Sequence, residues 1–76
     1  MIIKLNTIED INEFVNICSK YHSFDIDVKQ GHHIVNGKSI LGIFSLNTLK
    51  PMNVVIDTKI KELKISFYND IDKWKE

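Results

Sequence analysis

The side chains of this 76-residue chain that could carry chemistry are three histidines, one cysteine and several hydroxyl groups. His32 and His33 are adjacent, and on a strand adjacent side chains point to opposite faces, so one ion could not easily bind both. His22 follows a segment with helical periodicity, where a partly positive imidazole would complement the helix dipole. No cysteine or carboxylate cluster completes a metal-ligand spacing, and no set of acid, base and nucleophile is visible. We therefore expect no enzyme, no metal site and no cofactor.

Ser39 is the most informative hydroxyl, because it follows the turn-forming pair Asn36-Gly37 and is placed to cap a short helix. That helix would carry five apolar side chains, more than one core-facing side can bury: Ile40, Leu41, Ile43, Phe44 and Leu46. Ile43 and Leu46, three residues apart, can share the inward face. Ile40, Phe44 and part of Leu41 would then face outward beside the hydroxyl, as a docking surface does. The alternative is a short helix that is buried on all sides.

Composition limits the classes of function. Ten lysines balance ten acidic residues and there is no arginine, so neither nucleic acid nor an anionic membrane is an expected partner. The single Cys18 cannot form an internal disulfide and suits a reducing compartment. No apolar run approaches the roughly 20 residues of a membrane span, and the first residues do not resemble a signal peptide. We expect a small cytoplasmic protein, monomeric and built as one domain over residues 1–76.

Hydrophobic periodicity predicts seven elements in the order β-α-β-β-α-β-α. They are a strand at 1–6, a helix at 8–21 capped by Thr7, strands at 24–28 and 32–35, a helix at 40–46, a strand at 53–57 and a last helix through Leu63, Phe67, Ile71 and Trp74. The contiguous residues 54–56 predict a strand buried on both sides or central in its sheet. The order implies an α+β fold, with helices on one face of a four-stranded, mainly antiparallel sheet. Cys18, Phe67 and Trp74 are expected in its core.

Residues 38–46, Lys-Ser-Ile-Leu-Gly-Ile-Phe-Ser-Leu, resemble the regulatory-serine segment of HPr, the histidine-containing phosphocarrier of the sugar phosphotransferase system. Ser19-Lys20-Tyr21 is similar to the end of that family's first helix, at a compatible spacing, and Asn36-Gly37 fits as well. The resemblance covers essentially residues 1–75, although the final helix is shortened and poorly matched. It implies the open-faced β-sandwich of HPr.

The resemblance fails at the phosphorylated position of the family. There a histidine stands at the start of the first helix, followed by a variable residue, an arginine and a proline. This chain has Thr7 in place of the histidine, Glu9 in place of the arginine and Asp10 in place of the proline. Thr7 has no imidazole nitrogen, and two carboxylates occupy a place where phosphate needs positive charge. We expect Thr7 to be an ordinary helix cap and the usual carrier activity to be lost; transfer through His22, His32 or His33 remains an open alternative.

The resemblance also implies that Ser39 matches the serine phosphorylated by HPr kinase. Ile40, Leu41 and Phe44 would then match the surface that docks this kinase and a transcription regulator. Alternatively, Ser39 only caps its helix. The resulting hypothesis is an HPr-like regulatory or binding protein that carries no phosphoryl group on histidine and is regulated at Ser39. The other hypothesis is an HPr fold that serves as a protein-interaction module unrelated to sugar transport.

Overall fold

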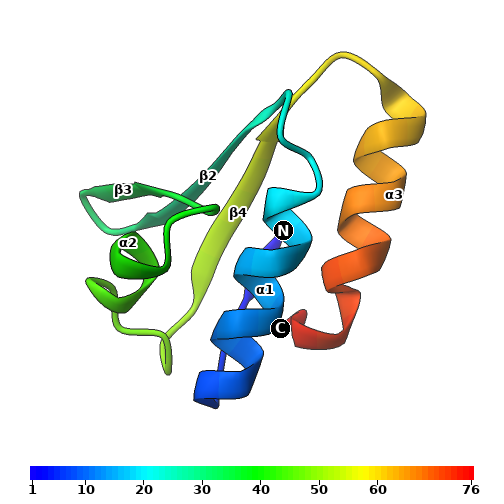
Figure 1. The fold of residues 1–76 in the computed structure, drawn as a ribbon. Helices are drawn as coiled ribbons and strands as arrows, with labels where there is room; N and C mark the ends of the chain where they lie inside the picture. The colour runs from blue at the N-terminus through cyan, green and yellow to red at the C-terminus, as the bar shows by residue number, and fades with distance from the viewer.

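Four strands and three α-helices make up two layers in the computed structural model, which describes residues 1–76 (Figure 1). In chain order they are β1 (Ile2–Ile3), α1 (Ile8–Ser19), β2 (Asp25–Gln30), β3 (His33–Asn36), α2 (Ile40–Phe44), β4 (Met52–Asp57) and α3 (Lys61–Ile71), followed by the 3-10 turn η1 (Asp72–Trp74). The predicted element order is confirmed.

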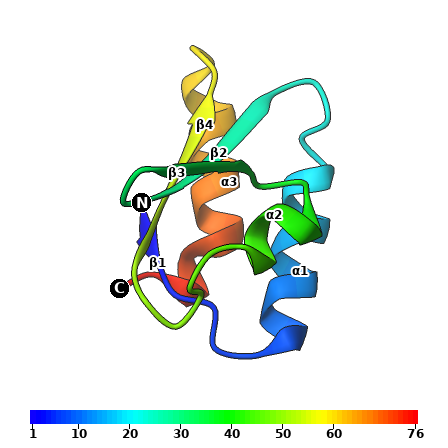
Figure 2. The same cartoon turned by 90° about the vertical axis from the view of Figure 1, so that its left-hand side faces the viewer.

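The sheet has the strand order β1-β4-β2-β3, and every pairing in it is antiparallel. All three helices lie on one face of this sheet, with α1 between α2 and α3, as the two views together show (Figure 2). The opposite face is open. The predicted α+β open-faced sandwich is therefore confirmed.

Strand β4 is central, as expected, but it is not buried on both sides. Val54 and Ile56 point into the core, whereas Val55 between them is exposed on the open face. Side chains alternate between the two faces of a strand, and here only one face is covered by helices. Three consecutive β-branched residues thus indicated a strand without indicating that both faces are buried.

The core lies between the sheet and the helices and contains fifteen buried apolar residues. Cys18, Phe67 and Trp74 belong to it, as predicted. The ring of Trp74 meets that of Phe14 edge to face, with centroids 6.0 Å apart, which joins η1 to α1. No helix of the chain combines the length and apolar character that crossing a bilayer requires.

Several elements are shorter in the structure than the sequence predicted. The first strand is paired only at Ile2–Ile3 rather than over six residues. Helix α1 ends at Ser19, because the amides of Lys20 and Tyr21 bond to carbonyls three residues back and tighten the chain into turns. The last helix ends at Ile71, and Trp74 belongs to the 3-10 turn that follows.

Candidate functional site

The N-terminus of α1, where the HPr resemblance leads one to expect a histidine, is closed by Thr7. Its backbone is extended, and its Oγ1 accepts a hydrogen bond from the Asp10 amide at 3.0 Å. The Thr7 carbonyl accepts the first helical hydrogen bond, from the Ile11 amide at 3.1 Å. Thr7 is therefore the helix cap that the sequence predicted, and its hydroxyl occupies one of the amides that an anion at this helix end would use.

Two carboxylates, Glu9 and Asp10, lie in the first turn of α1. The pKa of Asp10 is lowered, chiefly by the side-chain N–H of Trp74 and secondarily by hydrogen bonds from the Thr7 side chain and nearby backbone amides. Asp10 is therefore charged at neutral pH. Both acids complement the helix dipole here, and both would repel a phosphoryl group.

The N-terminus of α2 is closed in the same way. Ser39 is extended, and its Oγ accepts a hydrogen bond from the Gly42 amide at 3.1 Å. The turn before it is held by Asn36, whose carbonyl and side-chain oxygens accept from the amides of Ser39 and Lys38. Ser39 is only partly exposed, and no acidic residue lies in this first turn.

The outward apolar surface predicted on α2 is present. Ile43 and the following Leu46 are buried, while Leu41 is 80% exposed and Phe44 50%, and Ile40 is also exposed. A helix fully buried on all sides is thereby excluded. The helix can lie this close to β3 because a glycine faces that strand: a Cβ on Gly42 would be 3.2 Å from the Cβ of Val35.

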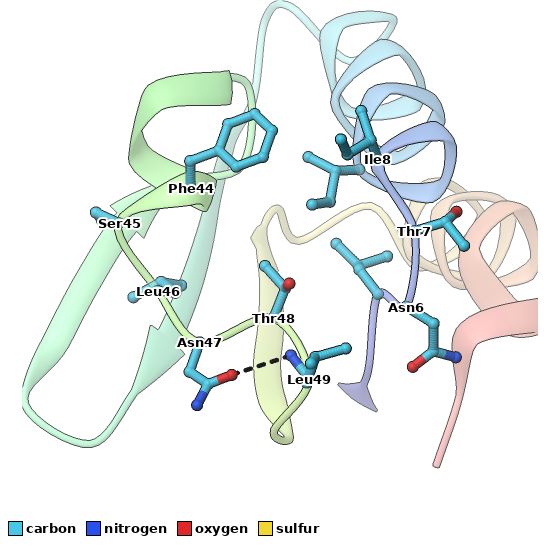
Figure 3. A pocket seen from close by; sticks show the side chains of 11 residues that line it. Asn6, Thr7, Ile8, Phe44, Ser45, Leu46, Asn47, Thr48 and Leu49 are labelled. Carbon is cyan, nitrogen blue, oxygen red and sulfur yellow. Dashed lines mark hydrogen bonds between the residues drawn. The ribbon is translucent and has the colours of Figure 1, made fainter.

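An open groove of about 630 Å³ lies between the start of α1 and the α2–β4 connection (Figure 3). The side chain of Phe44 points from α2 toward Ile8 on α1 (Figure 3). None of the eleven lining residues is charged: Leu5, Asn6, Thr7, Ile8, Ile11, Phe44, Ser45, Leu46, Asn47, Thr48 and Leu49. The groove therefore offers apolar contacts and neutral hydrogen-bonding groups, and no cation for a phosphoryl group.

Two polar contacts hold the α2–β4 wall of this groove. The Leu5 amide donates to the Thr48 carbonyl at 3.1 Å, which attaches the connection to the segment leading into α1. The Gln30 side chain donates to the Asn47 carbonyl at 2.7 Å and accepts from the Asn47 amide at 2.9 Å. The wall is thus anchored from both sides.

Sequence reasoning missed two groove residues. Ile8, in the first turn of α1, is 64% exposed at the groove. Leu49, in the α2–β4 connection, is also exposed there. An apolar residue in the first turn of a helix, outside the buried stripe, was the signal available for Ile8.

The three histidines lie outside the groove. All are exposed, His22 in the turn after α1 and His32 and His33 at the β2–β3 hairpin. No group of three or more histidine, cysteine or acidic side chains is arranged to hold a metal ion. Cys18 is fully buried, and burial raises the pKa of its thiol to about 12. It is packed as a small apolar residue.

Comparison with known proteins bears on the fold. No protein-family model matches the chain, and no curated protein matches it in sequence. Among solved structures, "HPr-C-His from Thermoanaerobacter tengcongensis" superimposes with a TM-score of 0.75 and 25% identity, covering 96% of this chain and 89% of that chain. This chain has an HPr-like fold. In this arrangement the groove lies between the helix end capped by Thr7 and the last residues of the 38–46 segment (Figure 3).

Proposed function

We propose that this protein is an HPr-like binding protein of the phosphotransferase network that carries no phosphoryl group on histidine and is regulated at Ser39. The observation that carries the proposal is the uncharged groove beside the start of α1. It has Thr7 where the family's histidine is expected, and two carboxylates follow in the same helical turn. A phosphohistidine needs an imidazole and nearby positive charge, and neither is supplied here.

The docking part of the proposal rests on exposed apolar side chains. Ile40, Leu41 and Phe44 are exposed on one helix of a small domain, beside the groove and next to Ser39. Apolar surface of this kind is typical of interaction sites. HPr kinase and a transcription regulator are the partners that the HPr resemblance suggests, and cytoplasmic location and a monomeric state accompany the same proposal.

A phosphate on Ser39 would change this surface directly. It would add roughly two negative charges at the start of α2, whose first turn contains no acidic residue. The adjacent Lys38 donates its Nζ to the Phe24 carbonyl at 2.6 Å, so it is already engaged in the unmodified protein. The modified helix end would therefore present new negative charge at the edge of the apolar surface, which can favour or exclude a partner.

Two phosphorylation reactions test the proposal. The purified chain is incubated with enzyme I and phosphoenolpyruvate, or with HPr kinase and ATP, and modified residues are located by mass spectrometry. We expect no phosphohistidine in the first reaction, with an HPr that has the active-site histidine as positive control. In the second reaction we expect one phosphate, lost in Ser39→Ala and kept in Ser45→Ala, which removes another exposed hydroxyl of the same segment.

The outcomes separate the hypotheses. Label on His22, His32 or His33 would show that carrier activity persists and would contradict the first half of the proposal. Absence of phosphate on Ser39 would contradict the second half. Phe44→Lys should slow Ser39 phosphorylation if the kinase docks on the apolar surface.

A second function is favoured by the same exposed surface. Ile8, Leu49 and Phe44 expose apolar groups that need no phosphate chemistry to bind a partner. The chain would then be a protein-interaction module unrelated to sugar transport. A chain that stays unmodified in both reactions would support this function.

A further inference from the structure

The C-terminal residues 72–76 contact both elements that meet at Thr7. On the strand side, the Trp74 carbonyl accepts from the Lys4 amide at 3.1 Å, and the Glu76 amide donates to the Ile2 carbonyl at 2.9 Å. The side chains of Lys4 and Glu76 form an ion pair at 3.1 Å. The end of the chain therefore runs along the outer edge of β1, immediately before the turn into α1.

The same residues hold α1 from the other side. Lys73 forms an ion pair with Glu13, and its Nζ lies 4.8 Å from the centre of the Trp74 ring. The Trp74 ring packs against Phe14 at an interplanar angle of 75°. We call residues 72–76 the C-terminal clasp.

The segment between these contacts has little other anchoring. Leu5 and Ile11 are buried, but none of residues 6–10 between them is. Three of these residues, Asn6, Thr7 and Ile8, line the groove. Their position cannot be set by their own burial, so it depends on the neighbouring strand and helix, which the clasp holds together.

We propose that the C-terminal clasp positions the α1 wall of the groove, and that Lys73 and Trp74 are positioning residues for the protein partner that the proposed function places there. The docking role rests on the proposed function; the positioning role does not. Neither side chain lines the groove. They act through the backbone at the β1–α1 junction, on the side of α1 that meets η1, and so fix where Ile8 lies relative to Phe44.

The test is amide hydrogen exchange measured by NMR on the full-length chain. Trp74→Phe replaces the buried indole by a smaller ring and so weakens its contacts with Phe14 and Lys73. Lys73→Met keeps the aliphatic stem and removes the ion pair with Glu13. The matched control is Lys64→Met, because Lys64 is exposed on α3 and has no ion-pair partner.

We expect the Asp10 and Ile11 amides, which bond to Thr7, to exchange faster in both clasp variants. The acceleration should be on the order of tenfold in Trp74→Phe, which weakens the buried ring contact with Phe14, and roughly twofold to fivefold in Lys73→Met, which loses an exposed ion pair. The Ile43 amide in α2 and the Val28 amide in β2 should be unchanged, and Lys64→Met should match the wild type.

Two results would overturn the proposal. Equal acceleration at Ile43, Val28 and Ile11 would mean that the clasp only adds global stability. No acceleration at Asp10 and Ile11 in either variant would mean that the wall is held without the clasp. Lys73 is exposed, so its variant should fold even where Trp74→Phe does not. The exchange rates do not depend on phosphorylation. The positioning role can therefore fail this test while the proposed function holds, and the proposed function can fail its own test while the positioning role holds.

Discussion

The starts of α1 and α2 are capped by the same type of hydrogen bond, but the charge and exposure of the neighbouring residues differ. In each, a hydroxyl accepts a hydrogen bond from the amide three residues on, at 3.0 Å for Thr7 and 3.1 Å for Ser39. Around Thr7 there are two carboxylates and the C-terminal clasp; around Ser39 there is no acid, and apolar side chains are exposed. The local hydrogen bond is therefore not what distinguishes the two ends. Charge and exposure nearby decide which of them could accept a phosphate.

The largest effect should come from the turn before the α2 cap, which packs against the last turn of α1 and against β2. A Cβ on the buried Gly37, which leads into the α2 cap, would lie 2.9 Å from Ile26 Cγ2 and 3.2 Å from the sulfur of Cys18 on α1. Gly37→Ala should therefore lower the free energy of unfolding by about 2 kcal/mol. Urea denaturation measures this.

The control for Gly37→Ala is Gly31→Asn in the β2–β3 hairpin. Gly31 has a φ of 58°, which asparagine tolerates, and nothing lies within 4 Å of an added Cβ. This variant should change stability by much less. Equal losses in the two variants would contradict the steric argument at Gly37.

A smaller effect should separate the two caps themselves. Thr7→Ala and Ser39→Ala each remove one capping hydroxyl, and each should cost about 1 kcal/mol of unfolding free energy. The loss at Thr7 should be the greater, because α1 has 12 residues and α2 only 5. Thr7→Ser and Ser39→Thr keep the hydroxyl and should stay near the wild type in the same urea titrations. A larger loss at Ser39 would reverse this order.

The smallest effect should be a difference in pH dependence between the two ends. The pKa of Asp10 is lower in the folded chain than its ordinary value of 3.8. Ionised Asp10 therefore adds stability above pH 3.8, and this contribution is lost as the pH falls through the folded-state pKa. Asp10→Asn should reduce the loss of stability between about pH 7 and about pH 3. Ser39→Ala should leave the acid slope unchanged, because no carboxylate lies in the first turn of α2.

The sequence was most informative where a feature depends on neighbours along the chain. The caps at Thr7 and Ser39, and the division of α2 into a buried Ile43 and an exposed Leu41 and Phe44, follow from spacing within one or two helical turns. The α+β class and the four-stranded, antiparallel sheet followed from the element order and from the HPr resemblance. These inferences needed no knowledge of distant contacts.

The features that sequence reasoning missed depend on residues far apart in the chain. Lys73 meets Glu13 across 60 positions, and the Leu5 amide meets the Thr48 carbonyl. No periodicity encodes such pairs, so neither the clasp nor the far wall of the groove could be predicted. The exposure of Ile8 at the groove likewise depends on the α2–β4 connection, which is distant in the chain.

Chemical labelling of the Cys18 thiol can report transient opening of the fold. Its thiol is fully buried behind Gly37, and with a pKa of about 12 it is almost entirely protonated at neutral pH. Only the thiolate reacts with alkylating reagents, so the folded chain should be nearly inert to them. Each labelled molecule will then record an excursion that separated α1 from the turn entering α2, and the labelling rate counts those excursions without any added probe.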